Sequence, residues 1–169
     1  KSMESKAMKY AIRLHQNQNQ LYDGFPYTKH LQMVVSIARK YIYYIDNCNK
    51  ENVLGACWCH DLIEDTGITK MSLANCLTTK ISDIVFAVTN ERGSNRNCDK
   101  IKTYNKIREN QLAVFVKLCD RIANTSNSKI MAIEKFIKYT NEFPVFKYYL
   151  KNRKYLYYDM LQELEKLYD

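Results

Sequence analysis

Residues that form tight turns are scarce in this sequence, which has only four glycines and two prolines among its 169 residues. A β-rich protein would need turn residues about every 8–12 positions. The sequence cannot supply them, so helices joined by short polar loops are the better interpretation. The length is sufficient for one domain with a real hydrophobic core but short for two.

Apolar residues recur at helical spacing through most of the chain. For example, Leu31, Val34, Val35 and Ala38 fall at positions i, i+3, i+4 and i+7, on one helical face. We therefore expect an all-α protein, a single compact bundle of roughly eight to ten helices that spans residues 1–169. The predicted helices cover residues 3–15, 28–45, 52–62, 71–78, 82–88, 100–110, 112–125, 130–139 and 145–167. The main predicted loops cover 17–25, 64–69 and 90–97, with Pro26 starting the second helix and Ser82 capping another.

The six cysteines are expected to be free thiols, because several lie inside apolar helical runs where a thiol packs as a small hydrophobic group. No CxxC pair is present, and Cys57 and Cys59 would point in different directions on a helix. Reduced cysteines indicate a cytoplasmic setting. Residues 1–10 lack the apolar segment of a signal peptide, and no run approaches the length of a transmembrane span, so we expect neither.

The formal net charge of +8 favours a partner that carries phosphate, whether a nucleotide, a nucleic acid or a membrane surface. The charge alone does not select among them, and a solvated basic surface is an equally good interpretation because the lysines are dispersed. No basic run interleaved with aromatic residues resembles a nucleic-acid recognition motif. Neither nucleic acid nor a membrane is therefore expected as a partner, and homo-oligomer formation stays open.

A cluster of polar groups suited to catalysis follows a nearly all-apolar run. Residues 58–66 contain His60, Asp61, Glu64 and Asp65. Unpaired charges beside a buried helix are costly, and a divalent cation would remove that cost. If the helix continues for one turn, Glu64 and Asp65 share a face with Asp61, and one of them can accept a proton from an attacking water. The alternative is that His60 and Asp61 close the helix while the other two are solvated.

Two more candidate ligands lie in similarly apolar surroundings. Asp120 comes late in a strongly apolar predicted helix, and His30 lies on the apolar-faced second helix. With His60 and Asp61 they would form a mixed nitrogen and oxygen ligand set, which suits an octahedral ion such as manganese or iron better than structural zinc. His15 stands alone on the first helix, so we interpret it as a hydrogen-bonded core residue.

The order His, His-Asp, Asp resembles the metal-binding signature of the HD superfamily. More specifically, the chain resembles the hydrolase domain of the Rel/Spo-type alarmone enzymes and their small stand-alone relatives. The specific part is the run His-Asp-x-x-Glu-Asp-Thr, and further likeness lies in the family's His-x-x-Gln, Gly-x-Pro-Tyr-x-x-His and Val-Lys-Leu-Ala-Asp-Arg-x-x-Asn patterns. The matching segments are residues 11–18, 24–30, 56–66, 116–124 and 139–150. The resemblance implies a single HD-type phosphohydrolase domain over nearly the whole chain.

The resemblance also implies a metal and a substrate. The implied metal ligands are His30, His60, Asp61 and Asp120. Manganese (Mn²⁺) is the first expectation, with Fe²⁺, Zn²⁺ or Mg²⁺ as alternatives. The substrate would be a phosphorylated nucleotide, guanosine tetra- or pentaphosphate (ppGpp or pppGpp), from which the enzyme removes the 3′-pyrophosphate.

The resemblance implies roles for four further residues. Glu64 and Asp65 would orient or deprotonate the attacking water, and Asn124 would contact the ribose or phosphate region of the nucleotide. Gln20 stands near the position where the family often has an Arg packed on the guanine base. A neutral amide there would still hydrogen-bond, with weaker discrimination between guanine and adenine.

Phosphate contacts are expected from the basic loop over residues 90–97 and the helix that follows it. An Arg side chain suits this role because its guanidinium can bind two phosphate oxygens at once. The alternative is an exposed loop that binds nothing. The candidates are Arg92 and Arg96 first, then Lys100 or Lys102, with Tyr104 and Arg108 further along. Lys117 and Arg121 flank Asp120 and are interpreted as structural pairing partners.

Two other functions are compatible with the same residues. The site could act on a nucleoside 5′-monophosphate, a cyclic nucleotide or the 2′-phosphate of a dinucleotide cofactor such as NADPH. The chain could also be a catalytically inactive binding module. Against the second, all four ligand positions and the Glu64-Asp65 pair are intact.

Overall fold

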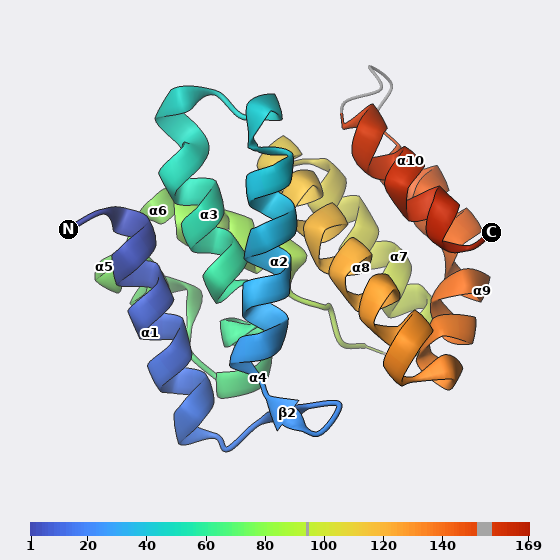
Figure 1. Ribbon diagram of the computed structural model, residues 1–169. Coiled ribbons are helices and arrows are strands. Elements are labelled where there is room, and N and C mark those ends of the chain that lie inside the picture. Colours follow the sequence, from blue (N-terminus) through green and yellow to red (C-terminus); the bar gives the residue numbers. More distant parts are fainter. Residues whose placement is uncertain (94, 152–156) are drawn as a thin grey trace.

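The computed structural model describes residues 1–93, 95–151 and 157–169, which form ten α-helices, two short 3-10 helices and one small hairpin (Figure 1). The elements are α1 (Met3–Asn17), β1 (Leu21–Tyr22), β2 (Phe25–Pro26), α2 (Thr28–Lys40), η1 (Ile42–Tyr44), η2 (Asn47–Asn49), α3 (Lys50–Cys59), α4 (Leu62–Thr66), α5 (Lys70–Cys76), α6 (Thr79–Val88), α7 (Arg96–Arg108), α8 (Gln111–Met131), α9 (Ile133–Leu150) and α10 (Tyr158–Leu167). The all-α prediction is confirmed. None of these described helices is long and apolar enough to cross a membrane.

Helix α8 is the centre of the bundle, and α2, α3, α6, α7, α9 and α10 all pack against it. Figure 1 shows α2 beside α8, α1 and α3 on the N-terminal side, and α9 and α10 on the C-terminal side. The run from Ala113 to Ala123 is buried except at Lys117, because its residues are apolar on nearly every face. Polar side chains on this stretch, such as Asp120, therefore lie in the interior of the protein.

Polar side chains fix where several helices begin. Asn110 accepts hydrogen bonds from the backbone N–H groups of Leu112 and Ala113, and so caps α8. Such caps satisfy backbone donors that have no partner within the helix. The other side-chain caps are Ser2, Thr69, Thr78 and Asn95. The prediction that Ser82 is a cap is wrong, because α6 begins a turn earlier and Ser82 is buried, donating to the carbonyl of Lys70.

A short hairpin connects α1 to α2, where the sequence predicted only a loop. Strands β1 and β2 are joined by Asp23 and Gly24, both at positive φ (47° and 85°), as a two-residue hairpin turn requires. The prediction that Pro26 starts the second helix is wrong, because Pro26 pairs with Leu21 in this hairpin and α2 begins at Thr28. The hairpin brings residues 20–27 over the ends of α1 and α2.

Three other predicted boundaries differ from the structure. The predicted loop over 64–69 is partly the helix α4, which is capped by Gly67 in the left-handed conformation (φ 74°) that glycine adopts without steric cost. Helix α9 continues through Pro144, so it joins residues predicted as two helices. The helix predicted over 145–167 is interrupted, since α9 ends at Leu150 and α10 begins at Tyr158, and the intervening residues 152–156 lie outside the described part.

We predict that the buried face of α7 contributes strongly to stability. Ile107 is fully buried, whereas Ile101 on the same helix is 38% exposed. Ile107→Ala should lower the free energy of unfolding by about 2–5 kcal/mol, since it removes buried apolar volume and leaves a cavity. Ile101→Ala is the matched control and should cost less than half as much. Urea unfolding followed by circular dichroism measures both, and equal losses would contradict this packing of α7.

Candidate active site

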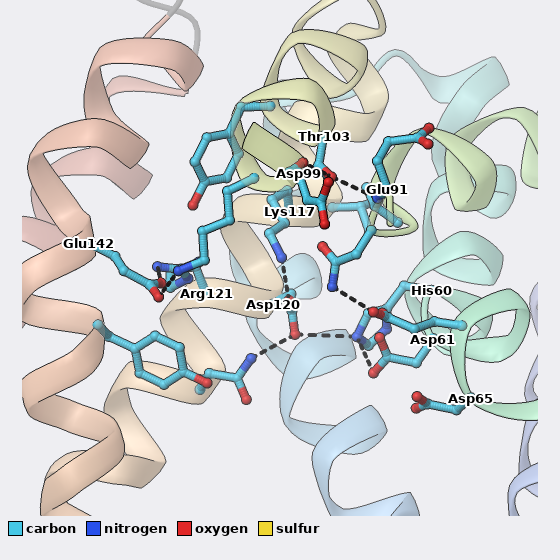
Figure 2. Close-up of a pocket in the computed structure, with 18 of the residues that line it drawn as sticks. His60, Asp61, Asp65, Glu91, Asp99, Thr103, Lys117, Asp120, Arg121 and Glu142 are labelled. Atoms are coloured by element: carbon cyan, nitrogen blue, oxygen red, sulfur yellow. Dashed lines mark hydrogen bonds and ion pairs between the residues drawn. The ribbon is translucent and has the colours of Figure 1, made fainter. Parts of the chain in front are cut away.

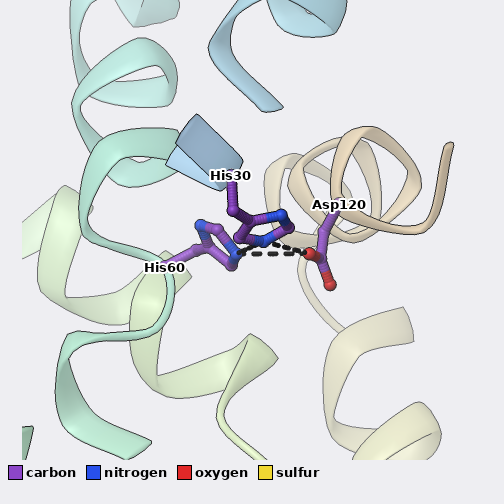
Figure 3. Close-up of side chains that lie close together, drawn as sticks. All are labelled: His30, His60 and Asp120. Atoms are coloured by element: carbon purple, nitrogen blue, oxygen red, sulfur yellow. Dashed lines mark hydrogen bonds and ion pairs between the residues drawn. The ribbon is translucent and has the colours of Figure 1, made fainter. Parts of the chain in front are cut away.

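Four helices, α2, α3, α4 and α8, bring four potential metal ligands together. His30 lies in the first turn of α2, His60 ends α3, Asp61 begins α4, and Asp120 lies on α8. His30, His60 and Asp120 are buried, and their ligand atoms all lie within 4.8 Å of one another (Figure 3). The break between α3 and α4 places His60 and Asp61, adjacent in sequence, beside the same point.

The donor atoms of this cluster are closely spaced. His30 Nε2 lies 3.2 Å from His60 Nε2 and 3.0 Å from Asp120 Oδ1. His60 Nε2 lies 3.3 Å from Asp120 Oδ1 and 3.0 Å from Asp61 Oδ2. Neighbouring ligands of an octahedral ion with bonds of about 2.1 Å are about 3.0 Å apart. The observed spacing therefore fits a cluster that surrounds one cation.

The hydrogen bonding of the imidazoles leaves Nε2 of His60 as the atom that faces the cluster. His60 Nδ1 lies 2.7 Å from the carbonyl oxygen of Cys57, which can only accept, so Nδ1 carries the proton. The lone pair of Nε2 then faces Asp61 and Asp120, as in metal-binding histidines generally. His30 Nδ1 is buried and has no hydrogen-bond partner among the described residues. Its Nε2 likewise faces the cluster.

Electrostatics favour a cation at this point. Burial alone would lower the pKa of His60, but the Asp61 and Asp120 carboxylates raise it well above the ordinary value. Burial opposes ionisation of Asp61, yet His60 lowers the pKa of that carboxyl to about 2. The carboxylates that attract a proton to His60 would equally attract a divalent cation between the four side chains. The His30, His60 and Asp120 group could thus hold a metal, with Asp61 beside it.

Two more carboxylates lie on α4, one turn beyond Asp61. Burial, together with the Asp61 charge, raises the pKa of Glu64 and of Asp65 above the ordinary values. Asn90 donates a hydrogen bond to Glu64 at 2.5 Å, and Gln20 donates to Asp65 at 2.9 Å. A carboxylate with a raised pKa is a better proton acceptor near neutral pH than an ordinary one.

Two tyrosines lie beside the cluster, and neither was predicted from the sequence as a site residue. The hydroxyl of Tyr27 donates to Asp61, and burial raises the pKa of Tyr27 so that it remains a donor. The ring of Tyr22 stacks on the imidazole of His30, with centroids 4.6 Å apart. Tyr27 could have been identified from the sequence, because it is the tyrosine of the Gly-x-Pro-Tyr-x-x-His pattern. The stacking of Tyr22 on His30 could not, because it depends on the hairpin turn.

Asn124, predicted to contact the nucleotide, makes hydrogen bonds within the protein. Its Nδ2 donates to Asp120 Oδ1 at 3.0 Å, and its Oδ1 accepts from Tyr22 at 2.7 Å. Asn124 thereby fixes the orientation of a candidate metal ligand. It also lines the cavity in front of the cluster, so a contact with a ligand bound there is compatible with its position.

A cavity of about 620 Å³ opens in front of the candidate ligands. Figure 2 shows Asp120 between its two sides, with His60 and Asp61 on one side and Arg121 and Glu142 on the other. The far side is rich in basic residues. Lys100 and Arg121 pair with Glu142 there, and Arg96 and Lys138 also line the cavity, whereas Lys117 lines it beside Asp120.

Ion pairs hold part of this basic side in place. Lys100 and Arg121 both bind Glu142, and they hold its pKa below the ordinary value although burial opposes this. Lys117 binds Asp120 at 3.2 Å. Lys117 and Arg121 therefore make the ion pairs expected of structural partners, and both also line the cavity.

The structure separates the other predicted phosphate-binding residues into two groups. Arg96, Lys100 and Tyr104 line the cavity. Arg92, Lys102 and Arg108 are exposed and do not line it, although other residues of the loop before α7 do. Tyr104 is only 3% exposed and its ring packs edge-on against Phe146, so it presents little surface to a ligand.

Comparison with known proteins supports the fold. No family model and no curated protein sequence matches the chain. Among solved structures, the chain is similar to one described as a metazoan ortholog of SpoT that hydrolyzes ppGpp and plays a role in starvation responses. The TM-score is 0.81 at 19% sequence identity, and the alignment covers 99% of this chain and 94% of that chain. The protein thus shares its overall fold with that hydrolase.

We predict that removal of either adjacent ligand eliminates metal binding. His60→Ala and Asp61→Ala should each yield folded protein without bound manganese, because each removes a donor atom from the cluster. His15→Ala is a matched control, since His15 is equally buried but belongs to none of these contacts. Elemental analysis after dialysis against Mn²⁺ measures the outcome. Full metal content in both cluster variants would refute the ligand assignment.

Proposed function

We propose that this protein is a metal-dependent phosphohydrolase that acts on a phosphorylated nucleotide, as one HD-type domain spanning residues 1–169. The observation that carries the proposal is the convergence of His30, His60, Asp61 and Asp120 at a cavity with a basic far side. In this proposal these four side chains are the metal ligands. Their mixed nitrogen and oxygen donors favour Mn²⁺ or Fe²⁺.

The side chains of α4 have the position and protonation behaviour needed for proton transfer. A divalent cation at the cluster would lower the pKa of a water molecule and screen the charge of a phosphate group. Glu64 or Asp65 then accepts the proton of the attacking water, since both line the cavity and both have a raised pKa. Tyr27 and Asn124 hold Asp61 and Asp120 in orientation.

The basic side of the cavity supports binding of an extended anion. Arg96, Lys100 and Lys138 can neutralise phosphate groups distant from the reacting one. Glu142 partly neutralises this side, and phosphate oxygens can replace its carboxylate as partners of Lys100. A nucleotide with phosphates at two positions matches a site with basic residues opposite the candidate metal.

Within this class, we propose that the enzyme removes the 3′-pyrophosphate of guanosine tetra- or pentaphosphate. The motif resemblance over residues 56–66 and 116–124 supports this substrate, as does the ppGpp-hydrolysing protein of similar fold. Hydrolysis at the 3′ position would yield pyrophosphate and guanosine 5′-diphosphate from the tetraphosphate, or guanosine 5′-triphosphate from the pentaphosphate.

A panel of nucleotides tests the substrate. We expect the protein with Mn²⁺ to release pyrophosphate from guanosine 3′-pyrophosphates, measured by ion exchange of the products. Adenosine 3′-pyrophosphates, a 5′-monophosphate, a cyclic nucleotide and NADPH are compared in parallel. Cleavage of one of the last three alone would overturn the alarmone substrate but retain the phosphohydrolase. No cleavage together with no bound metal would identify an inactive module.

We predict that the α4 carboxylates act in turnover and not in metal binding. Glu64→Gln and Asp65→Asn should retain bound manganese yet lower kcat by about 10²–10⁴-fold, as expected when a general acid–base group is removed. Asp83→Asn is a suitable control, because Asp83 is exposed on α6 and pairs only with Lys70 among the described residues. Normal rates in both α4 variants would show that neither carboxylate takes part.

A further inference from the structure

Gln20 lies between two half-buried or buried polar side chains that are distant in sequence. Its Nε2 donates to Asp65 Oδ2 at 2.9 Å, and its Oε1 lies 2.9 Å from His15 Nδ1. His15 belongs to α1, Asp65 to α4, and Gln20 immediately precedes strand β1. The three side chains therefore form one chain of hydrogen bonds that ends on a candidate catalytic carboxylate.

The chemistry of the three groups fixes the direction of each hydrogen bond. An ionised Asp65 can only accept, so the amide nitrogen of Gln20 faces it and the amide oxygen faces His15. That oxygen can only accept, so Nδ1 of His15 carries a proton. His15 is 1% exposed, and its Nε2 has no hydrogen-bond partner among the described residues. A proton on Nε2 would be a buried donor without an acceptor, so His15 is the neutral tautomer protonated at Nδ1.

Gln20 also lies at the boundary between two cavities. Its side chain lines the cavity of about 620 Å³ and a second one of about 370 Å³ that His15 also lines. Both ends of its amide contact protein side chains, one on each side of this boundary. Of the Asp65 oxygens, Oδ2 is held by Gln20, and no described residue donates a hydrogen bond to Oδ1. Oδ1 is therefore the oxygen available to accept a proton.

We propose that Gln20 is a positioning residue for Asp65, and that His15 in turn fixes the orientation of the Gln20 amide. In this arrangement Oδ2 is anchored and Oδ1 faces the attacking water. The inference rests on the proposed function. It differs from the base contact that the resemblance implied for Gln20. Both ends of the Gln20 amide already bind protein side chains, which hold it in its present position.

Kinetics of Gln20→Leu test this inference, with Gln32→Leu as the matched control at an exposed position that lines neither cavity. We expect kcat to fall by about 10–100-fold, the usual effect of removing a partner that orients a site residue, with KM unchanged. In an Asp65→Asn background, Gln20→Leu should cause no further loss. A raised KM with normal kcat, or a changed preference between guanine and adenine, would instead assign Gln20 to the substrate. Equal losses in both backgrounds would make its role merely structural, and either result overturns the proposal.

The His15 tautomer provides a readout that does not depend on activity. In ¹⁵N NMR spectra of the protein with diamagnetic Mg²⁺, we expect the proton of His15 on Nδ1, and loss of this preference in Gln20→Leu. A proton on Nε2 in a protein that cleaves nucleotides would overturn the inference and leave the proposed function intact. A protein that cleaves no nucleotide would overturn the proposed function, and the inference with it.

Discussion

Two imidazole nitrogens only 3.2 Å apart, beside two carboxylates, are the constraint on which the rest of the structure depends. Each group would prefer water, and three of the four side chains are buried. Direct hydrogen bonds can satisfy only part of such a cluster, because two unprotonated Nε2 atoms repel each other. A shared cation satisfies all of them at once, as it does in other mixed nitrogen and oxygen sites.

The fold positions these groups through helix ends and one central helix. Helix α8 is apolar around most of its circumference, so Asp120 is buried as a consequence of the packing of its neighbours. The break between α3 and α4 turns His60 and Asp61 toward that carboxylate. The hairpin adds Tyr22 over His30 and holds Asn124 against Asp120. Each candidate ligand is thus oriented by a second side chain or a backbone carbonyl.

The sequence indicates the cluster of candidate ligands better than its surroundings. His60, Asp61 and Asp120 stand out because charged groups in apolar helices need partners, and that requirement is visible without a structure. The position of Arg92 away from the cavity depends on the path of one loop, which no periodicity encodes. The same is true of Gln20, whose partners His15 and Asp65 become neighbours only when α1, the hairpin and α4 are packed.

The proposed function depends on one divalent ion at the cluster. An anomalous-difference map from crystals grown with Mn²⁺, recorded at the manganese absorption edge, tests this directly. We expect one strong peak within bonding distance of His30 Nε2, His60 Nε2, Asp61 and Asp120. A map with no peak there, in crystals where the four side chains instead bond to one another, would contradict it.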